Sequence, residues 1–77
     1  MLIPLDMLKK GEVAHIAEVS GEVAWVNRLA EMGLREGCQL QVLQPGSTCL
    51  LNVAGCRLCV RSHESSQILV RVQEPGA

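Results

Sequence analysis

The segment from Arg28 to Gly37 (RLAEMGLREG) constrains the fold of this 77-residue chain more than any other. It reads as the last turns of an amphipathic helix, followed by a glycine stop and a turn that a second glycine closes. Gly33 stands where a helix end needs positive φ, which glycine adopts without a Cβ penalty. Leu34 can then fold back on the last turn of the helix, as the residue after such a cap often does. The pattern predicts a short helix held at a set angle to the strand that begins at Cys38.

The helix itself is predicted from apolar residues that recur at helical spacing. Ser20 is the expected N-cap, because its hydroxyl can accept a hydrogen bond from an N–H of the first turn. At about 100° per residue, one half of the helix is apolar. Its members are Val23, Trp25, Val26, Leu29, Ala30 and Met32. This stripe is wider than a lone surface helix needs, so we expect the helix to contact more than one surface.

The remaining chain alternates as β-strands do. Glu12–Val19 has no clear phase, and a bulge or burial of both faces in a closed barrel would explain it. Residues 38–44 alternate cleanly. Ala54-Gly55 is a two-residue hairpin loop that sets Val53 opposite Cys56 and, four pairs further on, Cys49 opposite Val60. A short helical turn at residues 62–67 and a closing strand from Ile68 complete the pattern.

These elements predict one mainly β domain over residues 1–77, with residues 1–4 and 74–77 frayed. Its expected architecture is a small closed barrel of about five strands with one inserted α-helix and a short helical turn. The chain has one Trp and no Phe or Tyr. The core must therefore be built from aliphatic residues, Met and Cys.

Composition excludes several classes of function. With a net charge of −1 and almost no aromatic residues, the chain lacks both the basic field and the stacking surface that nucleic acids require. No apolar run approaches the ~18 residues of a membrane span, and no secretory signal is evident, so we expect a cytoplasmic protein without direct membrane insertion. No nucleophile elbow, phosphate loop or metalloprotease motif occurs. We therefore expect no enzyme activity.

The four cysteines raise the question of a metal. Cys56-x-x-Cys59, with His63 four residues later, has the spacing of half a zinc site. On a strand, however, an odd step places Cys56 and Cys59 on opposite faces. Cys38, Cys49 and Cys56 are in phase with the buried face, where cysteine packs as a small apolar residue. We expect no cofactor, with iron or zinc held by Cys56, Cys59 and His63 as the alternative.

Cys59 is expected to differ from the other cysteines. It falls on the outer face beside Arg57 and Arg61, and a positive environment of this kind favours the reactive thiolate. It is the cysteine that we expect to label readily.

A candidate partner surface lies at the edge of the helical stripe. Trp25, Arg28, Met32 and Leu34 combine apolar, aromatic and arginine side chains, the mixture enriched in protein interfaces. The competing interpretation makes Trp25 a core anchor, since a core poor in aromatic residues needs its volume.

Four stretches together resemble the FeoA family, small cytosolic proteins of bacterial ferrous iron transport. They are Leu5-x-x-Leu8-Lys9-x-Gly11, Arg28-Leu29-x-Glu31-Met32-Gly33-Leu34-x-x-Gly37, Val53-x-Gly55-x-Arg57-Leu58-x-Val60-Arg61 and Ile68-Leu69-Val70. The second stretch is the most specific, and the resemblance covers nearly the whole chain.

The resemblance implies an SH3-like barrel with an inserted helix. It also implies an accessory or adaptor role through contact with the cytosolic part of FeoB, the membrane iron transporter. No catalytic residues are implied. Similar domains occur at the C-termini of metal-dependent repressors, so a stand-alone regulatory domain of such a system is an alternative, as is a small metal-carrying module.

Two features depart from the family pattern. The loop between the middle strands is short, Gln44-Pro45-Gly46-Ser47-Thr48, where the family usually has a longer one. Four cysteines are also unusual for the family, and they keep the metal alternative open.

Overall fold

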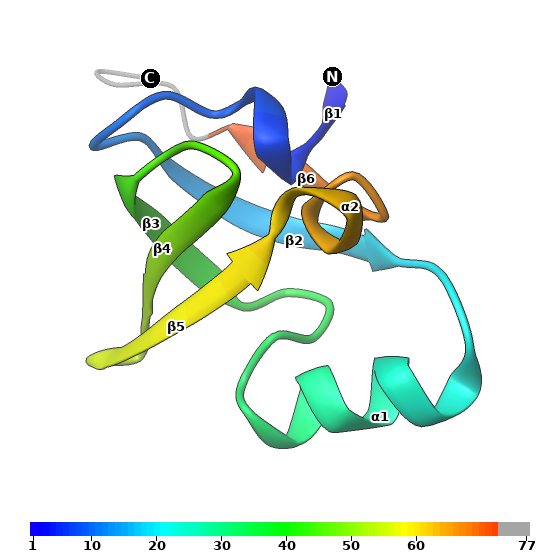
Figure 1. Cartoon of the computed structure of the whole chain (residues 1–77). Helices are drawn as coiled ribbons and strands as arrows, with labels where there is room; N and C mark the ends of the chain where they lie inside the picture. The colour runs from blue at the N-terminus through cyan, green and yellow to red at the C-terminus, as the bar shows by residue number, and fades with distance from the viewer. Residues whose placement is uncertain (73–77) are drawn as a thin grey trace.

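The computed structural model describes residues 1–72 and arranges them around one antiparallel sheet (Figure 1). In chain order the elements are β1 (Leu2–Pro4), the 3₁₀ turn η1 (Leu5–Met7), β2 (Val13–Val19), α1 (Val23–Glu31), β3 (Gln39–Gln44), β4 (Thr48–Val53), β5 (Cys56–Arg61), α2 (Ser62–Ser65) and β6 (Ile68–Val72). The expected mainly β fold with an inserted helix and a short helical turn is confirmed.

The sheet has six strands in the order β1-β6-β2-β3-β4-β5. It curves around the core, but among the described residues β1 and β5 remain its two edges (Figure 1). The expectation of a closed barrel of about five strands is wrong in this detail. The sixth strand comes from the start of the chain, which we expected to be frayed.

That first strand pairs with the last one. Leu2, Ile3 and Pro4 lie opposite Arg71, Val70 and Leu69 of β6. The prediction that residues 1–4 are frayed is therefore wrong for Leu2–Pro4, because β6 supplies a hydrogen-bonding partner along its outer side. Residues 74–77, also expected to be frayed, lie outside the described residues.

The β4–β5 hairpin forms in the register predicted from its turn. Val53 lies opposite Cys56, and the pairing continues without a slip to Cys49 opposite Val60. Ala54 and Gly55 form the turn with φ of 52° and 84°. Positive φ at both central residues is the geometry whose twist matches that of the flanking strands. The two-residue loop thus sets which side chains of β5 face outward.

The unclear phase of β2 comes from a bulge. Pairing with β6 is regular to Ile16 and resumes at Glu18, with a register shift between them. Ala14 and Ile16 are buried, whereas Glu18 is exposed. The extra residue turns the end of the strand so that it leads into α1, and the bulge proposed from the sequence is confirmed.

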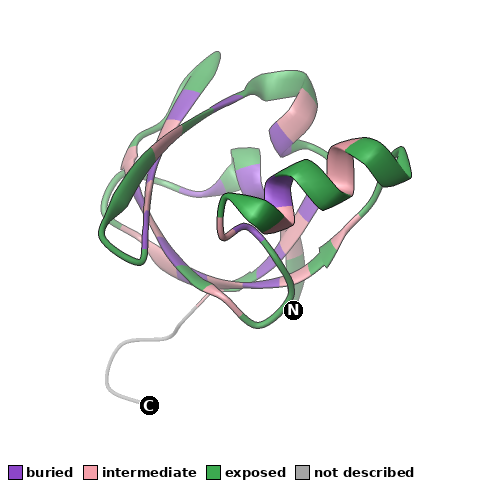
Figure 2. Cartoon of the chain, turned by 90° about the horizontal axis from the view of Figure 1, so that it is seen from below, coloured by how far each residue is buried: buried purple, intermediate pink, exposed green. Residues whose placement is uncertain are grey.

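The core lies inside the curve of the sheet, with η1 and α1 contributing to it (Figure 2). Its fully or nearly fully buried members are Leu5, Leu8, Ala14, Ile16, Leu29, Leu34, Leu40, Val42, Cys49, Leu51, Val53, Val60, Ile68 and Val70. The core is aliphatic, with Cys49 as its one fully buried thiol among the described residues. Cys38 is half-buried at its margin.

Cys56 corrects the sequence analysis. We expected it on the buried face, and it is exposed. It follows the turn directly, and its neighbours Ala54, Gly55 and Arg57 are exposed as well. Being in phase with the core is not sufficient here, because the hairpin projects past the elements that cover the core.

Candidate functional site

The end of α1 is built as the glycine pattern predicts. Met32 is the C-cap, and Gly33 follows it with a φ of 100°. The Gly33 N–H donates to the Ala30 carbonyl at 3.0 Å, and the Leu34 N–H donates to the Leu29 carbonyl at 2.8 Å. This pair of hydrogen bonds is the Schellman motif, which satisfies carbonyls that the helix leaves unpaired. It holds the last turn of α1 in one conformation.

The predicted partner residues separate at this helix end. Arg28 and Met32 are exposed, Met32 to 43%, and they are four residues apart, so they lie on one face of α1. Leu34, which we expected to join them, is fully buried. It is wrong as a surface residue because the cap turns its side chain back into the core. Arg28 and Met32 therefore form an exposed pair, which we call the α1 face.

Trp25 connects α1 to α2. It is half-buried against the core, and its Nε1–H donates to Glu64 Oε2 at 3.0 Å. Glu64 Oε1 accepts the Arg61 N–H at 3.2 Å, so one carboxylate fixes both the tryptophan and the start of α2. The hydrogen bond from Trp25, followed by that from Arg61, lowers the pKa of the Glu64 carboxyl. Trp25 is thus an anchor that joins α1 to α2.

The start of α1 differs from the prediction. Ser20 does not cap the helix: its hydroxyl donates to the Gln67 carbonyl at 3.0 Å, and Glu22 occupies the N-cap position without a side-chain hydrogen bond. Gly21 explains the altered path, since a Cβ there would lie 2.8 Å from Gln67 Oε1 and 2.9 Å from Trp25 Cε3. The chain is drawn toward the segment after α2 before α1 begins.

The structure does not bring the alternative metal ligands together. Cys56 and Cys59 are both exposed on β5, separated by an odd step that turns their side chains to opposite faces. His63 lies beyond the strand in α2. Within residues 1–72 there is no group of three or more His, Cys, Asp or Glu side chains placed to hold a metal ion.

The thiols differ in their surroundings. Burial, followed by the charges of Asp6 and Cys59, raises the pKa of the Cys49 thiol. Cys49 therefore stays protonated and unreactive in the core. Cys59 is exposed on the outer face of β5, as predicted.

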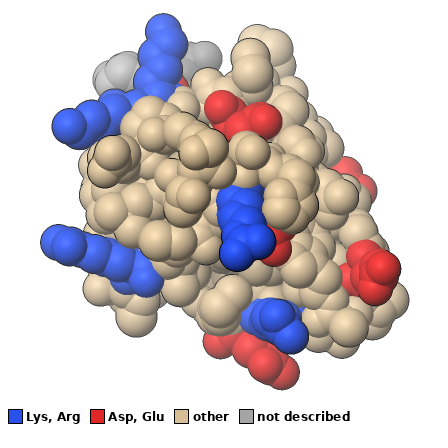
Figure 3. All heavy atoms as spheres, in the orientation of Figure 1, with Lys and Arg blue, Asp and Glu red and all other residues tan. Residues whose placement is uncertain are grey.

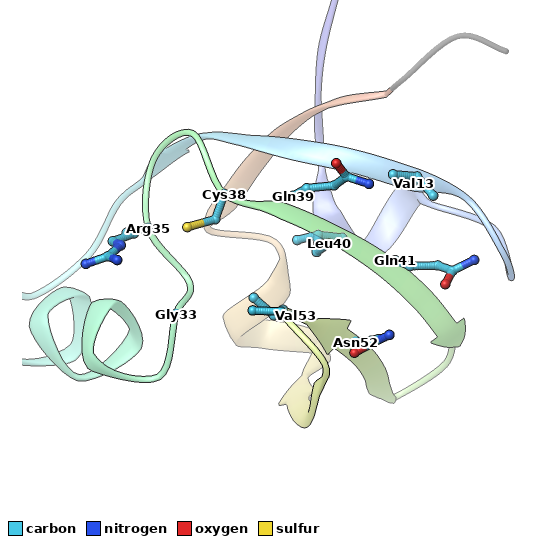
Figure 4. Close-up of a pocket in the computed structure, with 10 residues that line it drawn as sticks. Val13, Gly33, Arg35, Cys38, Gln39, Leu40, Gln41, Asn52 and Val53 are labelled. Atoms are coloured by element: carbon cyan, nitrogen blue, oxygen red, sulfur yellow. The ribbon is translucent and has the colours of Figure 1, made fainter. Parts of the chain in front are cut away.

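A hollow of about 480 Å³ lies beside the loop after α1 and was not foreseen from the sequence. Its lining includes Val13, Arg35, Cys38, Leu40, Asn52 and Val53 (Figure 4). Asn52 Oδ1 is buried without a hydrogen-bond partner in the described part of the chain. The hollow depends on how the 33–38 loop meets the sheet, and no local sequence pattern marks that contact.

None of the helices within residues 1–72 combines the length and the apolar character needed to cross a membrane.

Known proteins resemble this chain in both sequence and fold. The sequence matches the FeoA domain family over residues 3–72. No curated protein matches it significantly. A FeoA protein from Chlorobium tepidum, solved by NMR, is 32% identical, with a TM-score of 0.88 over 97% of this chain and 74% of that one.

Two further structures extend the likeness. The crystal structure described as an iron uptake regulatory protein (FeoA) is 25% identical, with a TM-score of 0.87 over 95% of this chain and 99% of that one. A manganese-dependent transcriptional repressor shares the fold alone, at 16% identity and a TM-score of 0.84 over 94% of this chain and 42% of the repressor. The SH3-like small β fold that the sequence predicts is confirmed by these neighbours.

The Arg28–Gly37 stretch, whose capped helix end organises the molecule, lies inside the matched region, and the match covers nearly the whole chain. The chain belongs to the FeoA family, and this membership supports a role in ferrous iron transport.

Proposed function

We propose that this protein is a non-enzymatic, cytoplasmic accessory of ferrous iron uptake that binds the cytosolic part of the membrane transporter FeoB. Family membership supports the pathway. The observation that carries the contact is the α1 face, where exposed Met32 and Arg28 stand on a helix end that two cap hydrogen bonds hold rigid. Because the main chain of this helix end is already fixed, binding there has to order only the side chains.

The proposed mechanism needs no bond-making chemistry. FeoB changes conformation, and a bound protein alters the balance of its states only through different affinities for them. The α1 face is a fixed surface, and it would bind best to the FeoB conformation that presents a matching one. The protein would thereby act as a selective ligand of one state of the transporter.

Charge introduced on the α1 face tests this proposal. We expect Met32→Glu to weaken binding to the cytosolic part of FeoB about tenfold or more, because a carboxylate would be buried at an apolar contact. Isothermal titration calorimetry measures the affinity, and urea unfolding of the same variants measures stability. Met32 is 43% exposed in the free protein, so its replacement should change stability little.

Val23→Glu is the matched control. Val23 is an apolar residue of the same helix and is 75% exposed. It lies nine positions before Met32, and at about 100° per residue this spacing places the two side chains on opposite sides of the helix. Its variant should bind FeoB like the unchanged protein. Equal loss of binding in both variants, or loss of stability in step with loss of binding in Met32→Glu, would contradict a specific α1 contact.

The metal-carrying alternative is decided separately. Elemental analysis and thiol titration of anaerobically purified protein would reveal one stoichiometric iron or zinc with Cys59 protected if Cys56, Cys59 and His63 hold an ion. On the proposed function, no stoichiometric metal accompanies the protein and Cys59 reacts freely.

A further inference from the structure

Strand β5 is an edge of the sheet. Among the described residues its hydrogen-bonded neighbour is β4 alone, and no strand pairs with its other side (Figure 1). An edge strand presents unpaired N–H and C=O groups, which can pair with an added strand from another chain. The position of β5 in the sheet thus makes it a candidate for strand addition.

The hairpin register identifies which main-chain groups face outward. Val53 and Cys56 close a two-residue turn and therefore exchange main-chain hydrogen bonds. Every second residue of β5 after Cys56 bonds to β4 in the same way. The N–H and C=O groups of the residues between them, Arg57 and Cys59, are directed away from β4.

Two hydrogen bonds at the end of the strand agree with this alternation. The Ser62 N–H donates to the Ser47 carbonyl at 2.9 Å, which continues the bonded set by one more pair. The Arg61 N–H belongs to the outward set, and it donates to Glu64 Oε1 at 3.2 Å and not to β4. The outward groups of Arg57 and Cys59 are therefore the ones left for a further strand.

The charge of this edge indicates which kind of strand can be added to it. The side chains of Arg57, Cys59 and Arg61 stand together on the outer face of β5, and all three are exposed. Figure 3, which views the molecule in the orientation of Figure 1, shows basic and acidic side chains scattered over this face, so the positive charge of the edge comes from Arg57 and Arg61 themselves. Two copies of β5 would bring like charges together, whereas an acidic strand would meet opposite charges.

α1 is tied to one end of this edge, and the residue after its C-cap passes close to the other end. Trp25 is hydrogen-bonded to Glu64 of α2, which follows β5, and a Cβ on Gly33 would lie 3.4 Å from Val53 Cγ1, at the hairpin that precedes β5. The α1 face and the β5 edge are thus built on the same supports, and one partner can contact both.

We propose that an extended, acidic segment of the partner protein adds as a strand to the open edge of β5. Its main chain pairs with the outward N–H and C=O groups of Arg57 and Cys59, and its carboxylates pair with Arg57 and Arg61. The inference rests on the proposed function for the identity of the partner, the cytosolic part of FeoB, and it names where and how that partner binds.

Cys59→Pro tests the main-chain contact, with Cys59→Ala as its control. Proline removes an N–H that β4 does not use and fills the edge with its ring, so the β4–β5 ladder can persist. We expect calorimetry with the cytosolic part of FeoB to show about tenfold or greater weakening for Cys59→Pro. Cys59→Ala, which keeps the N–H, should bind normally. Equal affinities of the two variants would overturn the inference.

Charge reversal gives a second test that leaves the backbone intact. Arg57→Glu with Arg61→Glu should weaken FeoB binding about tenfold or more and reduce its dependence on salt. Arg71→Glu, an exposed arginine on β6, should change neither. If Arg71→Glu weakened binding as much as the β5 double variant does, the inference would be contradicted. Unchanged FeoB affinity of the β5 double variant would contradict it as well.

The outcomes distinguish the inference from the proposed function. If the unchanged protein fails to bind the cytosolic part of FeoB, the proposed function fails. If it binds, and the β5 variants bind equally well while Met32→Glu does not, the function stands and strand addition is wrong. Self-association of the unchanged protein through β5, lost in Cys59→Pro, would also overturn the choice of an acidic partner.

Discussion

Glu64 joins α1 to α2, because its carboxylate accepts hydrogen bonds from both the Trp25 side chain and the Arg61 main chain. Sequence reasoning missed it. Residues 62–67 were predicted as a helical turn, and no local pattern shows that a tryptophan 39 positions earlier in the sequence ends beside that turn. The α1–α2 connection is thus a tertiary contact that only the fold reveals.

The lowered pKa of Glu64 predicts a loss of this connection in acid. A carboxyl whose pKa is lower in the folded state contributes stability that is complete above its unfolded pKa and is lost as pH falls through the lower folded value. Because Trp25 is the sole tryptophan, its fluorescence reports the contact. We expect the emission to change with a midpoint below that unfolded value.

Glu64→Gln serves as the control for this titration. The amide can still accept the Trp25 hydrogen bond but does not ionise, so its emission should stay constant over the same pH range. The effect on global stability should be small, since water screens a group that is only partly buried. A transition in Glu64→Gln identical to that of the unchanged protein would show that another group controls Trp25.

At the scale of elements, the glycine-capped end of α1 was the most accurately predicted feature. Gly33 has the positive φ that the pattern requires, and Leu34 packs as expected. The β4–β5 register was also predicted in full, because a two-residue turn leaves one register in which the faces stay consistent. Elements whose geometry is set by nearby residues can be read from the sequence.

Gly33→Ala should destabilise the protein by about 1–2 kcal/mol or more, since alanine is strained at positive φ. Gly37→Ala provides the comparison: its φ of 87° is also positive, but a Cβ there meets nothing within 4 Å. At Gly33 a Cβ would lie 3.4 Å from Val53 Cγ1. Because that distance is an ordinary van der Waals contact, backbone strain should decide both results, and urea unfolding should show losses of similar size. A much larger loss for Gly33→Ala would show that the contact with Val53 adds strain of its own.

The errors at this scale share one physical cause. Ser20 bonds to Gln67 in place of the helix, and Cys56 projects past the covered core. In each case a contact with a distant element, or the lack of one, overrides a correct local pattern. The same limit applied to the candidate site: Arg28 and Met32 could be placed on a helix face, but their exposure depended on where the rest of the chain packs.

At the scale of the whole molecule, an antiparallel sheet whose edges stay unjoined carries one helix that is hydrogen-bonded beyond one end of the edge strand β5 and passes close to the other. The expected closed barrel would have covered that edge. The strand order could not be predicted because the sixth strand, Leu2–Pro4, is too short and too irregular to show alternation. The open edge is the feature that links the fold to the proposed contact.

Hydrogen–deuterium exchange of the protein with and without the cytosolic part of FeoB tests the central claim most directly. The account predicts slower exchange on binding at the outward amides of Arg57 and Cys59 and around Arg28–Met32, with β1 and β6 unchanged. Exchange that is unaffected everywhere, or slowed only along β1 and β6, would contradict it.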